Sequence, residues 1–314
     1  MAYSTGNTII DDDYNIFATG NAAGSGNNGV RNINTIWGAG TTTYGYGQGT
    51  TVAAVSAGST ITATQWATLL TRMTSIANHQ GTSITSISNP SAGATISAYT
   101  ALDSNITTLF GDARFNAAAS GTDASVSSVT TATWTASAVL TKTFTFPSAA
   151  QLRYFFNAGG LLRFSWSRTG GTANNQNTAW TNLFTNSGVI ALSGDANSKS
   201  IASVAYTGTT KVGGSGTPTT LRTDLGLQNF TTNTVLYAQA APGAGYTTNN
   251  ISFAAAISGA VVTVTTTLSD GSGGFTDSVD GTLTQVSTIR NPSTTYLTAS
   301  WGTVSQNSPS WVTS

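Results

Sequence analysis

The residues that usually carry enzyme chemistry are scarce in this chain of 314 residues. It has one histidine, His79, no cysteine, and 11 acidic residues, every one of them Asp. Enzymes draw their acids, bases, nucleophiles and metal ligands mainly from His, Cys, Glu, Lys and Asp. We therefore expect a protein that presents a surface and holds a shape, with no catalytic residue and no cofactor.

His79 is the first candidate for chemistry. It falls near the end of a predicted helix, where an imidazole can hydrogen-bond the last carbonyl oxygens and complement the helix dipole. The chain has no Cys or Glu that could join it as a metal ligand or orient it as a base. A structural role is favoured over a catalytic one on this ground.

A second candidate is a Gly-rich stretch that contains Asp270, Ser272, Asp277 and Asp280. Oxygen ligands in such a loop could hold Ca²⁺, although their spacing does not match an EF-hand. Asp and Gly are also ordinary residues of hairpin turns. The hairpin interpretation is preferred, and Asp270, Asp277 and Asp280 remain a candidate calcium site.

Other possible sites are less specific. Asp11, Asp12 and Asp13 could bind a divalent ion, but acidic residues at a helix N-terminus explain them more simply. The glycine-rich stretches lack a phosphate-binding GxxxxGK[ST] motif, and no GxGxxG follows a predicted strand. Eleven Asp residues always include some pair that could act as glycosidase carboxylates, so such a pair indicates nothing.

The tryptophans divide into two groups. Trp66, Trp166 and Trp180 occupy periodic positions in predicted elements, which indicates the core rather than a sugar-stacking surface. Trp301 and Trp311 lie close to the C-terminus. We expect these two to contact a partner, since aromatic anchors are common in interfaces.

Composition sets further bounds. Charged residues make up 7% of the chain, whereas about 25% is usual. With 39% hydrophobic residues, 7 Trp, 10 Tyr and 12 Phe, the chain can build real cores, and its length suggests about two domains. The net charge is zero, so the chain lacks the excess of basic residues that is typical of a nucleic-acid binder. A net charge near zero also favours self-association.

Targeting signals are also missing from the sequence. The first residues are acidic where a signal peptide would be basic and then apolar. No apolar run approaches the roughly 18 residues of a membrane span. We expect a product made in the cytoplasm, without a membrane contact.

Residues 1–118 are predicted to form a small, mainly helical module. Thr62 and Gln65 have the spacing of a capping box, and Gly81 can end the helix that follows. Its apolar positions recur at helical spacing: Trp66, Leu69, Leu70, Met73, Ile76 and Ala77. A second helix is expected from Tyr99 to Phe110, and a short one from Asp11.

Residues 119–314 are predicted to form an antiparallel β-sandwich with two short helices, so the fold class is α+β. The small and polar residues 112–128 are predicted to be a linker. Alternating patterns predict strands over 138–146, 161–168, 250–257, 260–268, 281–289 and 296–304. The short helices are expected to begin at Ser148 and Thr178.

Several segments carry a family resemblance. In the second half these are Phe146-Pro147, AAQLRYFFNAGGLLRFSWSRTGG, QNTAWTNLFTNSGVI and LSDGSGGFTDSVDGTLT. In the first half they are DYN at 13–15, YGYGQ at 44–48, ITATQW at 61–66 and HQG at 79–81. Together they resemble virion structural proteins of tailed bacteriophages, of the kind found in contractile-tailed phages of cyanobacteria and other aquatic hosts. Asp11-Asp12 before DYN departs from that pattern.

The resemblance implies a non-catalytic structural component of a phage tail, of baseplate, fibre or collar type. Its partners would be copies of itself and other virion proteins, and its place the virion, assembled in the host cytoplasm. A trimer is suggested by analogy with fibres, and host-surface glycans would be further partners if the sandwich binds a receptor. The alternatives are a capsid decoration or cement protein and, as an enzyme, a polysaccharide depolymerase.

Overall fold

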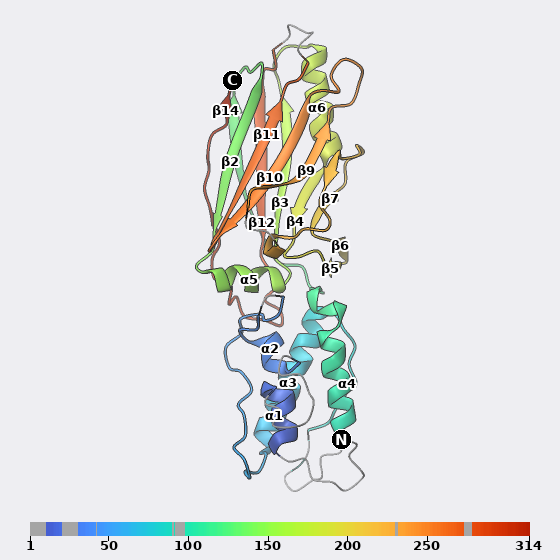
Figure 1. Cartoon of the computed structure of the whole chain (residues 1–314), viewed down its shortest axis with the longest axis vertical. Helices are drawn as coiled ribbons and strands as arrows, with labels where there is room; N and C mark the ends of the chain where they lie inside the picture. Colours follow the sequence, from blue (N-terminus) through green and yellow to red (C-terminus); the bar gives the residue numbers. More distant parts are fainter. Residues whose placement is uncertain are drawn as a thin grey trace.

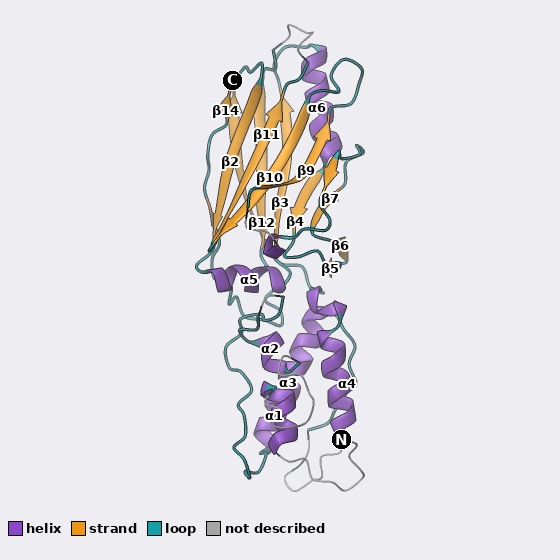
Figure 2. Cartoon of the chain, in the orientation of Figure 1, coloured by secondary structure: helices purple, strands orange, loops and turns teal. Residues whose placement is uncertain are grey.

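The chain folds into two parts placed end to end, with helices at one end and a β-sandwich at the other (Figure 1). Figure 2 shows that the strands gather in one part, where α5 Ala149–Asn157 and α6 Asn175–Ser187 accompany them, and that the other part is helical. The α+β class is thereby confirmed. This computed structural model describes residues 11–20, 31–41, 43–89, 91, 98–229, 232–272 and 278–314.

The helical part contains α1 Asp11–Thr19, α2 Ile33–Trp37, α3 Ala63–Gln80, α4 Tyr99–Phe110 and the 3-10 turn η1 Asp112–Phe115. The capping box is present, because the Thr62 hydroxyl accepts the N–H of Gln65 at 3.2 Å and the Gln65 carboxamide accepts the N–H of Thr62 at 2.8 Å. Gly81 ends α3 at a φ of 67°, a left-handed conformation that favours glycine. The predicted start and stop signals of α3 are confirmed.

Long extended segments in this part are held by side-chain amides. Asn15 accepts the N–H of Val55 and donates to its carbonyl oxygen, both at 2.8 Å. Asn34 makes the same two bonds to Val52, and Asn105 makes them to Thr85, again at 2.8 Å each. An amide carries one acceptor and a donor pair, so it can replace a strand partner for a single residue. Three asparagine side chains therefore hold the extended segments of the helical part in place, one residue each.

The predicted linker over 112–128 is wrong. Strand β1 begins at Asp123, inside the predicted linker. The residues before it are also held, since the N–H of Ala117 donates to the Ser200 carbonyl at 2.9 Å and that of Ala118 donates to the His79 carbonyl at 2.7 Å. The small, polar composition of this segment is typical of a flexible linker. In the structure, however, its backbone is hydrogen-bonded to both the helical part and the sandwich part.

The sandwich has a five-stranded and a seven-stranded sheet, and all named strand pairs are antiparallel. The first sheet runs in the order β1 Asp123–Thr131, β12 Thr282–Arg290, β3 Leu161–Thr169, β4 Val189–Leu192 and β7 Thr209–Val212. The second runs in the order β13 Ser305–Gln306, β2 Ser137–Thr145, β11 Val261–Ser269, β10 Asn250–Ser258, β9 Thr234–Ala240 and β8 Thr220–Leu221, with β14 Val312–Thr313 also on β2. A small separate hairpin joins β5 Lys199–Ile201 and β6 Val204–Tyr206.

Five of the six predicted strands are confirmed, as β2, β3, β10, β11 and β12. Along β2, β11 and β12 buried residues alternate with more exposed ones, as a strand between core and solvent requires. The inward rings meet between the sheets, with Phe164 of β3 at 5.6 Å from Phe144 of β2 and 4.7 Å from Phe253 of β10. The predicted strand over 296–304 is wrong, because that segment bonds to the helical part instead of to a sheet.

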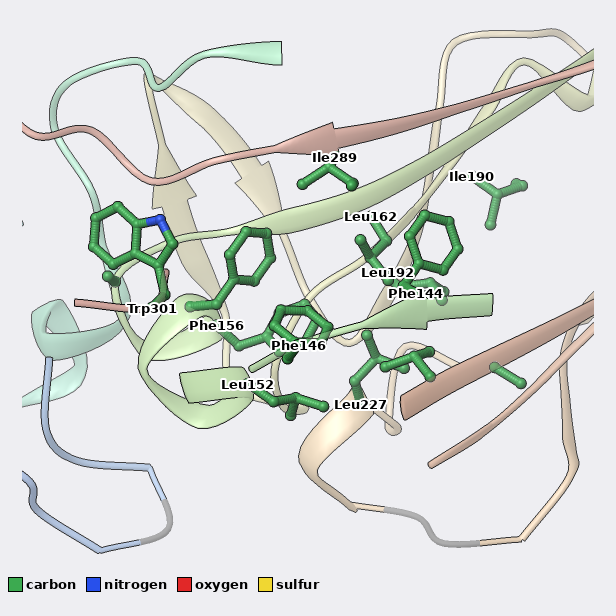
Figure 3. Close-up of a cluster of buried hydrophobic side chains, with 14 of the residues drawn as sticks. Phe144, Phe146, Leu152, Phe156, Leu162, Ile190, Leu192, Leu227, Ile289 and Trp301 are labelled. Atoms are coloured by element: carbon green, nitrogen blue, oxygen red, sulfur yellow. The ribbon is translucent and has the colours of Figure 1, made fainter. Parts of the chain in front are cut away.

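Both predicted short helices are present, as α5 Ala149–Asn157 and α6 Asn175–Ser187. Ser148 caps α5 as expected, whereas α6 begins before Thr178 because the Asn174 carboxamide accepts the N–H of Asn177 at 2.7 Å. A 3-10 turn, η2 Leu227–Asn229, follows β8. Helix α5 crosses the end of the sandwich that faces the helical part (Figure 1). There Leu152 and Phe156 of α5 join Phe144, Leu227 and Trp301 in one buried cluster (Figure 3).

Candidate functional site

The junction between the two parts is built around the loop that follows α2. Gln48 lies in this loop and is 4% exposed. Its carboxamide oxygen accepts the N–H of Thr298 at 2.7 Å, and its nitrogen donates to the Thr298 carbonyl at 2.9 Å and the Ser300 hydroxyl at 3.0 Å. Ser300 in turn donates to the Tyr46 carbonyl. We call the residues Tyr46, Gln48, Thr298 and Ser300 the seam.

Helix α5 holds the same loop from the sandwich side. Asn157 donates to the carbonyl oxygens of Tyr44 at 2.8 Å and Gly45 at 3.1 Å. Gly47 has a φ of 66°, and a Cβ at this position would overlap the ring of Tyr154. Because Gly47 has no side chain, the YGYGQ segment can pack directly against Tyr154 of α5.

His79 packs into this junction and does not reach solvent. It is 1% exposed, and its ring lies 5.0 Å from the ring of Tyr46, edge to face. Burial lowers the pKa of His79 to about 4, while an interaction with the Ala158 backbone acts in the opposite direction. The imidazole is therefore neutral at pH 7. Within the described part of the chain, no group of three His, Cys, Asp or Glu residues could hold a metal ion.

The hydroxyl of Tyr46 forms a second set of buried hydrogen bonds at the junction. It donates to the Arg114 carbonyl at 3.2 Å and accepts from the Gln80 carboxamide at 3.1 Å. Burial raises the pKa of Tyr46, so its hydroxyl stays protonated at physiological pH. The arrangement positions the loop, and it presents no ionised group to solvent.

The residues of the candidate calcium site are engaged in local hydrogen bonds. The Asp280 carboxylate accepts from the N–H of Thr172 at 3.0 Å and its hydroxyl at 2.8 Å, and also from Asn177. These bonds lower the pKa of Asp280. Asp270 accepts from the N–H of Ser272 at 3.0 Å and from Gln176. Asp277 lies outside the described residues.

Asp280 and Asp270 both tie the ends of the β11–β12 connection to the N-terminal region of α6. The hairpin interpretation of the stretch is wrong, because β11 belongs to the seven-stranded sheet and β12 to the five-stranded sheet, so the connection passes from one sheet to the other. The other acidic group, Asp11, Asp12 and Asp13, forms the first turn of α1, where carboxylates favour the positive end of the helix dipole.

Trp301 and Trp311 do not lie where we expected a partner to bind. They are 2% and 6% exposed, respectively. Trp301 belongs to the cluster at the base of the sandwich (Figure 3). Trp311 closes an edge of the sandwich, where its indole N–H donates to the Ser128 carbonyl at 3.3 Å. Their position near the end of the sequence suggested exposure, but both rings are buried in the hydrophobic core of this chain.

Trp66, Trp166 and Trp180 are buried, as predicted. The large apolar side chains that do face solvent in the described part of the chain were not predicted. They are Val129, Val204, Val235, Tyr296 and Val312. The signal of the four valines in the sequence is weak, because a valine at an outward strand position looks like any other strand residue.

The outer face of the seven-stranded sheet is rich in threonine and free of charge on its three long strands. The outward positions of β2 and β11 include Thr141, Thr143, Thr263 and Thr265. Thr141 lies opposite Thr265, with their hydroxyls 3.4 Å apart. The outward positions of β10 are filled by Asn, Ser and Ala. This face offers hydroxyl groups and methyl groups, and the outward positions of these three strands carry no ionised side chain that would have to be desolvated in a contact.

Comparison of the chain with protein-family models, curated proteins and solved structures gives no match. Within the described residues, none of the helices has both the length and the apolar character needed to cross a membrane.

Proposed function

We propose that this protein is a non-catalytic structural component of a tailed-phage virion and belongs to the tail. The observation that carries the proposal is the seam, which joins two differently built parts into one elongated body. A tail component must hold its displayed surface at a fixed position relative to its site of attachment. A hydrogen-bonded junction between the two parts serves this better than a flexible linker. The resemblance of the RYFFNAGG and YGYGQ segments to phage virion proteins supports the same assignment.

The two parts would have different tasks. The helical part would attach the subunit to its neighbours, and the sandwich would be displayed outward. The uncharged outer face of the seven-stranded sheet supports self-association, because packing one uncharged face against another requires no charge to be desolvated. Copies of the same chain are therefore the first partners that we propose.

The assignment is tested by locating the protein on intact virions. Antibodies raised against the purified chain, and detected by gold labelling in electron microscopy, should mark the tail. Antibody absorbed beforehand with the purified protein serves as the control. Labelling of the capsid shell would instead favour a decoration protein, and virions that remain unlabelled after mild permeabilisation would contradict a virion role.

A further inference from the structure

An open groove of about 510 Å³ lies beside the seam, on the surface where the two parts meet. One wall comes from the helical part and the other from the C-terminal segment 294–298. The residues that matter for its chemistry are Trp37, Gln48, Thr50, Arg72, Ser75 and Tyr296. The lining contains no acidic residue, so Arg72 gives the groove a net positive charge.

Arg72 is held in place without a carboxylate. Its guanidinium carbon lies 4.7 Å from the centre of the Trp37 ring, and its Nη2 donates to the Thr50 hydroxyl at 2.9 Å. No ion pair of the described residues includes Arg72. Its Nε is shielded from solvent and has no hydrogen-bond partner. A guanidinium that lines a groove and has no carboxylate partner is suited to an anionic acceptor, since arginine binds carboxylates with a planar fork of donors.

Thr50 contributes to this placement through its backbone. It has a φ of 51°, a left-handed conformation that is uncommon for a residue other than glycine. Such strained residues concentrate at binding sites. The conformation lets the Thr50 hydroxyl donate to the Gly49 carbonyl at 2.7 Å while it accepts from Arg72. Arg72 is thereby oriented before any ligand arrives.

The opposite wall is apolar and hydroxyl-rich. Tyr296 is 40% exposed and is the one large aromatic side chain among the exposed large hydrophobic residues of the described chain. Thr294, Thr295 and Thr298 lie beside it in the lining. Gln48 positions this wall, because its carboxamide bonds Thr298 to the helical part. The groove is thus preformed by the seam.

We propose that this groove binds a sugar that carries a carboxylate, with Arg72 pairing with the carboxylate and Tyr296 covering the sugar ring. One arginine and no acidic residue suit a single negative charge better than a doubly charged phosphate. Hydroxyls and a phenol ring suit a pyranose better than a bare anion. The volume falls within the range of about 300–1,000 Å³ that small-molecule sites occupy. The proposal concerns the purified chain and does not depend on its place in a virion.

The proposal is tested by calorimetric titration of the full chain with galacturonate, and in parallel with galactose and inorganic phosphate. Galacturonate and galactose share the ring and differ in the carboxylate, so their comparison isolates the contribution of Arg72. We expect galacturonate to bind at least about tenfold more tightly than galactose, a difference of about 1.4 kcal/mol. Arg72→Gln should abolish that preference, while Tyr296→Ala should weaken the binding of both sugars.

Arg222→Gln is the matched control, because Arg222 is an exposed arginine paired with Asp224 away from the groove lining. It should bind galacturonate like the unaltered chain. Circular dichroism and a thermal melt of each variant separate loss of binding from loss of folding. Equal binding of the two sugars, tighter binding of phosphate than of galacturonate, or no binding of either sugar would overturn the proposal.

Discussion

The carboxamide of Gln48 and the backbone of Thr298 form a two-bond pair across 250 positions of sequence, with an N–H to oxygen distance of 2.7 Å in one direction and 2.9 Å in the other. The pair resembles one rung of a β-ladder in which a side chain replaces one strand. It joins the first 50 residues to the last 20 and forms one end of the proposed sugar groove. Because Gln48 is buried, its polar atoms have no water to replace these partners.

Gln48→Glu should destabilise the protein. The glutamate keeps the size of the side chain and can still accept from Thr298, but an ionised carboxylate cannot donate to the Thr298 carbonyl. The buried donor–acceptor pair becomes a pair of two acceptors. This change should lower the free energy of unfolding by about 1–3 kcal/mol, and by more if the buried carboxylate is charged. Urea unfolding measures the loss. The control Gln65→Glu changes a partly exposed glutamine whose side-chain oxygen accepts the N–H of Thr62 at 2.8 Å, as a carboxylate also can, and it should stay within about 0.5 kcal/mol.

Asn15→Asp tests the asparagine pairs of the helical part. The carboxylate accepts from Val55 as before, but it repels the Val55 carbonyl to which Asn15 donates. Stability at pH 7 should fall by about 1–3 kcal/mol. A protonated carboxyl can donate again, so the folded state binds the proton more tightly and the deficit should shrink as the pH is lowered toward 4. A deficit that does not change with pH would contradict this explanation.

Lys142 is a buried base whose charge should cost stability. It is 0% exposed on β2, and its Nζ has no hydrogen-bond partner among the described residues. Burial lowers the pKa of Lys142 to about 8. The unfolded chain holds this proton up to about pH 10.4, so between the two pKa values the unfolded state binds more protons and stability rises with pH. The cost is fully present at pH 7.

Lys142→Met removes that charge and keeps an unbranched side chain of similar length. We expect the variant to be more stable than the unaltered protein at pH 7 by about 1–3 kcal/mol, and the gap to narrow at pH 9.5. Urea unfolding at the two pH values measures both effects. A variant that is less stable at pH 7 would show that Lys142 is paired in solution, for example with ordered water or an anion.

Asp280→Asn should lower the melting temperature without any link to calcium. The carboxylate accepts from Thr172 and Asn177, and the amide that replaces one of its oxygens cannot accept. Loss of these bonds should cost about 1–3 kcal/mol. Calcium and a chelator should leave the melting temperature of the unaltered protein unchanged. A rise with calcium that disappears in Asp280→Asn would instead establish the metal site.

Thr141→Lys tests the uncharged face of the seven-stranded sheet as a contact between copies. Thr141 points outward from β2, so a lysine there should leave the fold intact and place a charge in the contact. Analytical ultracentrifugation should show an oligomer for the unaltered protein and a shift toward monomer for this variant. The control Thr71→Lys changes an exposed residue of α3 and should assemble normally. A monodisperse monomer of the unaltered chain would refute self-association.

Local patterns were sufficient for much of the fold. Thr62, Gln65 and Gly81 mark the ends of α3 because caps satisfy backbone groups within a few residues of themselves. The alternation in Leu162, Phe164 and Trp166 predicts β3 because a strand buries every second side chain. The α+β class and the burial of Trp66, Trp166 and Trp180 follow from such short-range rules.

Only the tertiary structure decided where the remaining segments belong. Residues 296–304 have a strand-like composition, but Thr298 bonds to Gln48 rather than to a neighbouring strand. Trp301 and Trp311 were expected to be exposed and are enclosed, because burial depends on which distant segments return to cover a residue. The groove around Arg72 was not predicted for the same reason. Its two walls lie more than 200 residues apart in sequence, and no pattern within one segment shows that the folded chain places Arg72 in a groove without a carboxylate.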